Sequence, residues 1–311
     1  MASRSLINMS LDALIVNDIA AELGVDPTFI EKDWYSVQVL RALASYQSDT
    51  ICTIFSGGTS LSKGYGMLQR FSEDLDFRCG YLVKGSSHQH RKVRSAYRAD
   101  IIETLRTLDH VELNENEIDI ASNYIKFPLT YIRQTSLHSA LRPHLELEFS
   151  FTPTQLPPEL RSLQSLVSKF LGEDPETEIL CLAPIETAAD KLSALTWRVL
   201  KRDRSLPNDD PAMIRHLHDL CALSPSIRAN FDLFRLTALS SFEEDQRTSK
   251  RSTKEGLRAS METALTELKR DEVYKKEYRQ FVDGMSYADD ADKIRFEVAL
   301  DTFEALIVLF E

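Results

Sequence analysis

The chain has 311 residues, of which 43% are hydrophobic and 27% are charged, and its formal net charge is −11. These proportions are those of a soluble globular protein and exclude a disordered or a membrane-embedded chain. The acidic balance argues against a protein that coats nucleic acid indiscriminately, although a local basic groove is compatible with it.

The cysteines and the N-terminal residues indicate the compartment. The four cysteines are widely spaced, without the C-x-x-C or Cys/His spacing of a zinc site. We therefore expect reduced thiols and a cytoplasmic protein. Asn8, Asp12 and Asn17 interrupt the short apolar stretch at the N-terminus, so it does not resemble a secretory signal. No apolar run approaches membrane-spanning length, and we expect no membrane association.

Two helices are predicted before the first strand. Apolar residues recur at helical spacing over residues 11–23, and Gly24 follows where a helix stop is favoured. The second helix should run over residues 26–44, with Asp26 as its N-cap. This helix pair also fits a DNA-binding helix-turn-helix over residues 19–40, which would make the chain a non-catalytic regulator. Acidic side chains in the would-be recognition helix weigh against that interpretation.

A glycine turn follows the first predicted strand, residues 50–55, and precedes a predicted helix over residues 61–69. The residues of the turn are Gly57, Gly58, Thr59 and Ser60. Paired glycines let the backbone approach a phosphate, and the N–H and hydroxyl groups after them can donate to its oxygens. Taken alone, such a turn is more often structural than catalytic.

Two carboxylates, Asp74 and Asp76, return one residue apart on a second predicted strand. Because strand side chains alternate, both should point to one face while Leu75 and Phe77 point to the core. Two hard oxygen ligands on one strand suit Mg²⁺. A glycine turn and a carboxylate pair in this order indicate metal-dependent phosphoryl transfer.

A basic stretch follows, and a helix predicted from Ser87 to Thr107 would place Arg91, Arg94 and Arg98 on one face. That face could hold nucleotide phosphates or an RNA backbone, although a solvated charged face is the commoner explanation.

Two further segments, residues 118–132 and 145–151, have strand patterns. In the second, Glu146 and Glu148 share the face opposite the apolar residues. A third carboxylate beside Asp74 and Asp76 would complete a metal site. An amphipathic edge strand with solvated glutamates explains the same pattern.

The prolines of residues 152–158 mark the best boundary, and the pattern beyond them is helical nearly to the end. We therefore predict a catalytic core with N-terminal helices over residues 1–155 and a helical domain over residues 156–311. A helix opening at Pro184 places Lys191 and Arg198 on one side, where they could grip a triphosphate or form an ordinary polar face. Arg215 and Asp219 form an i, i+4 pair, a spacing also common in surface ion pairs.

Together these motifs resemble the AbiEii/AbiGii nucleotidyltransferase toxin family of the DNA polymerase beta-like superfamily. The resemblance covers about residues 25–225. It rests on Gly57-Gly58-Thr59-Ser60-Leu61-Ser62-Lys63, Arg70-Phe71-Ser72-Glu73-Asp74-Leu75-Asp76, Glu31-Lys32-Asp33-Trp34, the helix from Pro184 to Arg198, and Arg215-His216-x-x-Asp219. The resemblance implies an α+β fold: a polymerase beta-like core with a small mixed sheet flanked by helices, then a C-terminal helical bundle that completes the cleft for NTP and acceptor.

The resemblance also implies an activity and partners. Members are toxins of toxin–antitoxin or phage-defence (abortive infection) systems, with an antitoxin encoded by an adjacent gene. They transfer a nucleotide from an NTP to an acceptor hydroxyl, in some members at the 3′ end of tRNA, which blocks translation.

The site residues follow by position. The resemblance implies that Gly57, Gly58, Thr59 and Ser60 hold phosphates, that Asp74 and Asp76 bind Mg²⁺, that Lys191 contacts the NTP phosphates, and that Asp219 positions or deprotonates the acceptor hydroxyl.

Two departures and two alternatives accompany this assignment. Ser56 stands where the family often has Lys, so Lys63 is the candidate to replace that basic contact. Glu148 is favoured as the third carboxylate, with Glu146 as the alternative. The acceptor could instead be a protein Ser or Thr, including one of this chain, or the chain could be the non-catalytic regulator described above.

Overall fold

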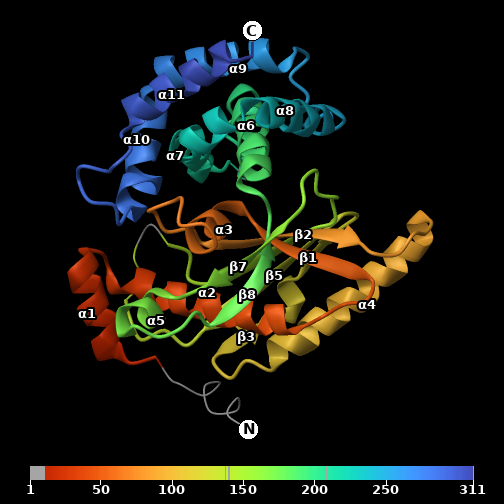
Figure 1. Cartoon of the computed structure of the whole chain (residues 1–311), viewed down its shortest axis with the longest axis vertical. Helices are drawn as coiled ribbons and strands as arrows, with labels where there is room; N and C mark the ends of the chain where they lie inside the picture. The colour runs from red at the N-terminus through yellow and green to blue at the C-terminus, as the bar shows by residue number, and fades with distance from the viewer. Residues whose placement is uncertain (1–10, 137, 139–140, 208, 311) are drawn as a thin grey trace. The chain divides into compact units, whose positions relative to one another are not determined.

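The computed structural model describes residues 11–136, 138, 141–207 and 209–310 (Figure 1). Contacts divide the chain into two compact units. Unit 1 comprises the chain up to residue 66 and residues 71–182, and unit 2 comprises residues 67–70 and the chain from residue 183 onward. The short segment 67–70 thus belongs to unit 2, although unit 1 precedes and follows it in the sequence.

Unit 1 is built on a mixed sheet, which within the described residues has eight strands. The strands are β1 (Ile51–Ser56), β2 (Asp74–Tyr81), β3 (Val111–Leu113), β4 (Asp119–Ala121), β5 (Tyr124–Tyr131), β6 (Leu145–Ser150), β7 (Glu159–Leu163) and β8 (Thr177–Cys181). Their order is β3-β5-β6-β2-β1-β8-β7, and β4 pairs with β5. β2 is parallel to β6 and β1 is parallel to β8, while the other pairs are antiparallel. The mixed sheet implied by the resemblance is confirmed.

Alternation along the central strands decides which face of the sheet is apolar. Leu75 and Phe77 of β2 and Leu147 and Phe149 of β6 are almost fully buried. The rings of Phe77 and Phe149 stack with their centroids 4.7 Å apart. Buried residues of helices α2 (Pro27–Ser45) and α4 (Ser87–Arg106) belong to the same core cluster. The carboxylates at the intervening positions therefore lie on the opposite face, as predicted.

The N-terminal helices begin and end within two residues of the predicted bounds. Helix α1 (Ala13–Leu23) ends at Gly24, whose φ of 64° is left-handed, and Asp26 caps α2 through its side chain. The charged triplet Glu31, Lys32 and Asp33 on α2 is buried within unit 1. A recognition helix must present an exposed polar face to a DNA groove. This burial excludes the helix-turn-helix interpretation of residues 19–40.

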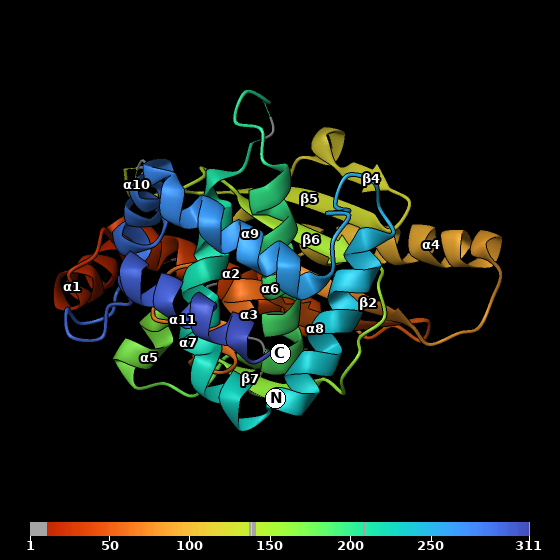
Figure 2. The ribbon, with the colours of Figure 1, turned by 90° about the horizontal axis from the view of Figure 1, so that it is seen from above.

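Unit 2 is helical, as predicted for the C-terminal region. Its α-helices in the described residues are α6 (Pro184–Lys201), α7 (Arg215–Ala229), α8 (Phe231–Gln246), α9 (Leu257–Arg270), α10 (Glu272–Phe281) and α11 (Phe296–Val308). Figure 2 shows α7, α8 and α9 around α6, and α6 contacts all three. The apolar side of α6, including Ala188, Leu192 and Leu195, is fully buried. Because α6 lies at the centre of the bundle, some of its polar residues, including Lys191, are buried together with its apolar side.

Two segments differ from the sequence prediction. The helix after the glycine turn is α3 (Gly57–Lys63) rather than residues 61–69, because Gly64 and Gly66 follow and Gly66 takes a left-handed φ of 64°. We expected helices after residue 158, but β7, the short helix α5 (Leu166–Leu171) and β8 lie there, and unit 1 extends to residue 182. Strands of five residues carry too few alternations to be separated from a helical pattern.

Two expectations about the whole chain can also be compared with the structure. The four cysteines, Cys52, Cys79, Cys181 and Cys221, are free. In the part of the chain that the structure describes, no helix combines the length and the apolar character needed to cross a membrane.

Candidate active site

Strand register gathers the predicted carboxylates on one face of the unit 1 sheet. In the parallel pair β2–β6, Asp74 lies beside Glu146 and Asp76 lies beside Glu148. One carboxylate oxygen from each of Asp74, Glu146 and Glu148 lies within 4.8 Å of the others. Hard oxygen ligands at this spacing can hold a divalent cation such as Mg²⁺. The sequence left the two glutamates as alternatives, and the structure brings both to Asp74.

Burial and mutual repulsion act on the pKa of Glu148 within this group. Burial, with the negative charge of Asp74 beside it, raises the pKa of Glu148, whose carboxyl group also accepts a hydrogen bond from Tyr124. Bringing a cation to the group would relieve this repulsion. The donor set and its electrostatics therefore both fit a divalent metal ion.

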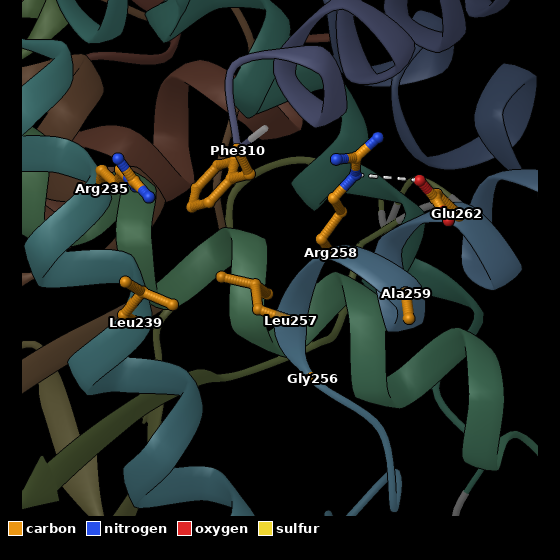
Figure 3. Close-up of a pocket in the computed structure, with 8 residues that line it drawn as sticks. All are labelled: Arg235, Leu239, Gly256, Leu257, Arg258, Ala259, Glu262 and Phe310. Atoms are coloured by element: carbon orange, nitrogen blue, oxygen red, sulfur yellow. Dashed lines mark hydrogen bonds and ion pairs between the residues drawn. The ribbon is translucent and has the colours of Figure 1, made fainter.

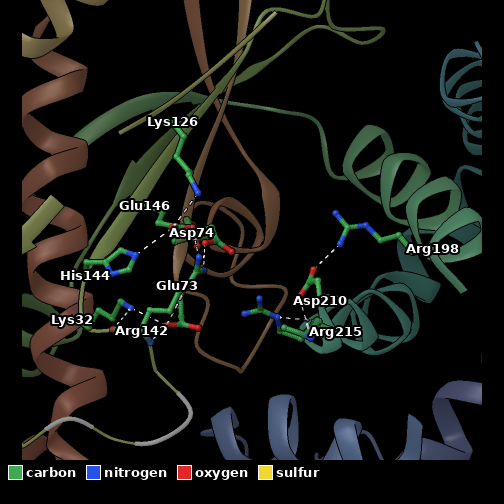
Figure 4. A network of polar contacts seen from close by, with 12 residues as sticks. Lys32, Glu73, Asp74, Lys126, Arg142, His144, Glu146, Arg198, Asp210 and Arg215 are labelled. Atoms are coloured by element: carbon green, nitrogen blue, oxygen red, sulfur yellow. Dashed lines mark hydrogen bonds and ion pairs between the residues drawn. The ribbon is translucent and has the colours of Figure 1, made fainter. Parts of the chain in front are cut away.

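Sequence reasoning missed Arg142, which lies in the connection between β5 and β6. Its guanidinium forms ion pairs with Asp74 and Glu146, as Figure 4 shows. Burial alone would lower the pKa of Arg142, but the surrounding carboxylates outweigh burial and raise it. Lys126 on β5 also approaches Glu146, with Nζ 3.3 Å from Oε1. An arginine in a loop belongs to no periodic pattern. The only sequence feature that could have indicated its role is its position just before β6, the strand that carries Glu146 and Glu148.

Gly57 brings the glycine turn against the second carboxylate of β2. Its φ is +74°, and a Cβ built on it would lie 2.0 Å from Oδ2 of Asp76. The hydroxyl of Thr59 donates a hydrogen bond of 2.6 Å to the carbonyl of Asp74. Thr59 thus ties α3 to β2, and its hydroxyl proton is not available to a phosphate. Only glycine at position 57 permits this close approach.

We expect Gly57→Ala to lower both stability and activity. The left-handed φ and the clash with Asp76 should cost about 1–3 kcal/mol of unfolding free energy. A displaced Asp76 should lower nucleotidyl transfer about 100-fold. Chemical denaturation and a labelled-nucleotide assay measure these effects. Gly80→Ala on β2, the strand of Asp76, is the control, because a Cβ there meets nothing within 4 Å. Equal losses in both variants would contradict the assignment.

Lys63, predicted to contact the nucleotide, has other partners. Its ammonium group pairs with Asp33 of α2 and lies 3.5 Å from the carbonyl oxygen of Gln164. Asp33 also accepts a hydrogen bond of 2.8 Å from the backbone of Leu166 at the start of α5. In the structure Lys63 therefore holds the end of α3 within unit 1.

Unit 2 contains a second charged cluster, centred on Asp219 of α7. Arg70 donates to both oxygens of Asp219 over 2.8 and 2.6 Å, and Lys191 of α6 pairs with it at 2.8 Å. Nδ1 of His218 lies 3.0 Å from Oδ1. All four side chains are buried. The structure thus pairs the predicted Lys191 with the predicted Asp219. It also pairs Asp219 with Arg70, a residue to which the sequence assigns no role.

Asp219 is ionised and saturated with donors. Burial alone would raise the pKa of its carboxyl group, but Arg70 and Lys191 outweigh burial and hold this pKa well below its usual range. A general base needs a pKa near the working pH and access to the proton that it removes. Of the two roles that the resemblance implies for Asp219, the geometry supports positioning rather than deprotonation.

The remaining predicted cations of unit 2 have their own partners (Figure 4). Arg198 pairs with Asp210 at 2.6 Å, and Nε of Arg215 donates a hydrogen bond of 3.1 Å to the carbonyl of Ala212.

The α4 arginines of unit 1 differ in their surroundings. Arg94 donates a hydrogen bond of 2.6 Å to the hydroxyl of Tyr81 and lies over the Phe151 ring. Arg91 is exposed, with Nη2 3.4 Å from Nδ1 of His88, and Arg98 is partly exposed. Arg91 and Arg98 thus present cationic side chains to solvent on one side of α4.

A cavity of about 610 Å³ lies in unit 2 between α8 and α9 (Figure 3). Leu239, Leu257 and Phe310 form apolar walls, and Arg235 and Arg258 lie at its margin. Its lining carboxylate, Glu262, pairs with Arg258. None of the predicted catalytic residues lines this cavity.

Comparisons with known proteins agree with this geometry. The family model described as "Nucleotidyl transferase AbiEii toxin, Type IV TA system" matches residues 38–305. Among solved structures, MenT4, nucleotidyltransferase toxin Rv2826c from Mycobacterium tuberculosis H37Rv, is similar with a TM-score of 0.56 at 18% identity. That alignment covers 97% of this chain and 100% of that chain. At 18% identity this similarity supports a shared fold. A comparison with curated protein sequences finds no significant match.

Proposed function

Because the chain belongs to the family of AbiEii nucleotidyltransferase toxins of type IV toxin–antitoxin systems, we propose that it transfers a nucleotide from an NTP to the 3′ end of tRNA. Addition there would block aminoacylation and so translation. In this proposal the protein acts in the cytoplasm, in phage defence, and an adjacent gene encodes its antitoxin. The observation that carries the proposal is the group formed by Asp74, Glu146 and Glu148, with Asp76 beside it.

These carboxylates would hold Mg²⁺. A bound Mg²⁺ would neutralise and orient the phosphates of the NTP. The acceptor hydroxyl attacks the α-phosphorus in line, and pyrophosphate leaves. Backbone N–H groups of the glycine turn donate to the phosphate oxygens, and the contact between Gly57 and Asp76 keeps that turn beside the carboxylates.

The resemblance to the family implies that Lys191 would supply positive charge to the triphosphate. Arg70 and Lys191 together carry two positive charges, and Asp219 carries one negative charge, so this cluster retains one positive charge. Lys191 contacts the phosphates, and Asp219 holds its ammonium group in place. A buried and preorganised cation stabilises developing negative charge more strongly than a solvated one.

The acceptor would lie along α4. Residues 82–98 contain Lys84, Arg91, Lys92, Arg94 and Arg98 and no Asp or Glu, in a chain of net charge −11. Such a local excess of positive charge suits the backbone of an RNA. This stretch favours RNA over a protein acceptor.

We expect the double variant Arg91→Glu/Arg98→Glu to weaken binding of tRNA without weakening binding of NTP. The KM for tRNA should rise, and the salt slope of tRNA binding should fall by about one for each lost phosphate contact. Steady-state kinetics and binding at several salt concentrations measure both. A rise in the KM for NTP alone would instead assign these arginines to nucleotide phosphates.

The function is tested by incubating the protein with each labelled NTP in three mixtures. One contains tRNA, one contains tRNA whose 3′ ribose has been oxidised with periodate, and one contains no RNA. We expect label on intact tRNA only, at its 3′ end by sequencing. Label confined to the protein band would reject the tRNA proposal and support modification of a protein Ser or Thr. Expression with and without the neighbouring gene tests the antitoxin.

A further inference from the structure

The Glu31-Lys32 part of the α2 motif anchors the connection between β5 and β6. Glu31 accepts hydrogen bonds from the backbone N–H groups of Gln134 and Thr135 and from the Thr135 hydroxyl. Lys32 donates 3.0 Å to the carbonyl of Arg142. Two consecutive buried residues of α2 thus hold the beginning and the end of one connection.

Glu73 completes the anchor at Arg142. Its Oε1 atom accepts hydrogen bonds from Nζ of Lys32 at 2.8 Å and from the backbone N–H of Arg142 at 2.6 Å. Both the N–H and the carbonyl of Arg142 are therefore bound to a buried ion pair. Lys32 and Glu73 are 4% and 7% exposed, which makes this a rigid attachment.

The side chain of Arg142 is held differently from its backbone. Its guanidinium forms ion pairs with Asp74 and Glu146, its Nε lies 3.9 Å from Oε1 of Glu73, and the side chain is 35% exposed. A guanidinium forms bidentate pairs with phosphate as readily as with carboxylate. With its backbone fixed and its side chain partly exposed, Arg142 can exchange the partners of its guanidinium by rotating the side chain alone.

We propose that Arg142 couples metal binding to nucleotide binding: its guanidinium neutralises Asp74 and Glu146, and a triphosphate draws it away and frees both carboxylates for the divalent cation. Lys32 and Glu73 are positioning residues that keep the guanidinium within reach of both partners. The inference rests on the proposed function, because it assumes that the carboxylate group binds a metal ion and an NTP.

The thermodynamic consequence is positive cooperativity. The metal ion and the nucleotide both favour the arrangement in which Arg142 has left the carboxylates, so each ligand increases the affinity for the other. Without the guanidinium, the carboxylates would attract the cation without help from the nucleotide. Removal of Arg142 should therefore strengthen binding of metal alone and weaken the coupling.

Binding of Mn²⁺ tests this coupling without any transfer reaction. The Kd of Mn²⁺ is measured by electron paramagnetic resonance, with and without a non-hydrolysable NTP analogue, for the unmodified protein and Arg142→Gln. In the unmodified protein, we expect the analogue to lower the Kd roughly tenfold or more. In Arg142→Gln, Mn²⁺ alone should bind more tightly, and the effect of the analogue should shrink at least several-fold.

Two further variants separate this role from a structural one. Arg133→Gln removes an exposed arginine from the same connection and should retain the full coupling. Arg142→Lys retains the charge but not the bidentate fork, and should show intermediate coupling. Weaker binding of Mn²⁺ alone in Arg142→Gln, with the coupling unchanged, would overturn the inference and leave Arg142 a structural residue.

Binding of Mn²⁺ and of the analogue to the unmodified protein distinguishes an error in the role of Arg142 from an error in the proposed function. If the unmodified protein binds neither Mn²⁺ nor the analogue, the proposed site itself is wrong. If it binds both without cooperativity, the site stands and the role of Arg142 is rejected. A thermal melt of each variant shows whether it is folded during these measurements.

Discussion

Asp74→Asn should lower the rate of nucleotidyl transfer about 1000-fold, because the variant removes a charged ligand at the point where phosphate charge must be neutralised. Asp74 is the member of the carboxylate group that also contacts Arg142 and accepts the Thr59 hydrogen bond through its carbonyl. The Asn side chain preserves size and the backbone contact. The loss should therefore appear in kcat, measured with labelled NTP at saturating acceptor.

Two comparisons make this result specific. Asp119→Asn replaces an exposed aspartate on β4 and should transfer nucleotide at the unmodified rate. Asp76→Asn should behave like Asp74→Asn, because Asp76 lies on the same face beside Glu148. If Asp74→Asn kept full activity and full inhibition of cell growth, the carboxylate group could not be the metal site.

The sequence predicts the carboxylate face because strand alternation is a local property. Leu75 and Phe77 identify the buried side of β2, which leaves Asp74 and Asp76 on the other side. On β6 the same reasoning gives two glutamates, of which Glu148 is favoured and Glu146 is the alternative. The parallel register of β2 and β6, which places both beside the aspartates, is a long-range pairing that no local pattern contains.

The missed residues are all defined by long-range contacts. Arg142 lies 68 residues from Asp74, and Arg70 lies 149 residues from Asp219. A single arginine in a loop has the same local pattern whether it is solvated or buried in an ion pair. Arg70 is further obscured because residues 67–70 belong to unit 2, although unit 1 surrounds them in the sequence.

Unit 1 extends to residue 182, beyond the boundary predicted near residue 155, for a related reason. β7 lies at the edge of the sheet and has three exposed residues, so its five residues show little of the alternation of a half-buried strand. β8 has only five residues, of which two are buried. Their pairing with each other and with β1 stabilises them as strands. Tertiary context, not local propensity, therefore sets the boundary at residue 182.

Asp219→Asn should be the most destabilising of these substitutions, with a loss of about 3–5 kcal/mol of unfolding free energy. The variant leaves Arg70 and Lys191 buried beside a neutral amide, at 2% and 7% exposure. Two desolvated cations would then repel each other without a counter-ion. Urea denaturation measures the loss, and activity should fall with it, because Lys191 loses the partner that fixes it.

Asp210→Asn is the matched control in the same unit. It also removes an aspartate that pairs with an arginine, but the side chains of Arg198 and Asp210 are 35% and 51% exposed. Exposed pairs contribute at most about 1 kcal/mol. Equal losses in the two variants would contradict the view that burial makes the Asp219 cluster essential.

The pH dependence of the Asp219 effect has a definite sign. Because the folded pKa of Asp219 is well below its usual value, its charge stabilises the folded protein at every pH above the unfolded value of about 3.9. The difference between Asp219→Asn and the unmodified protein should therefore stay constant from pH 8 to pH 5. This difference in unfolding free energy should narrow only below about pH 4, where Asp219 becomes protonated in the unfolded chain and its stabilising effect on the folded protein decreases. A difference that already narrowed near neutral pH would mean that Asp219 titrates there, and would restore it as a candidate general base.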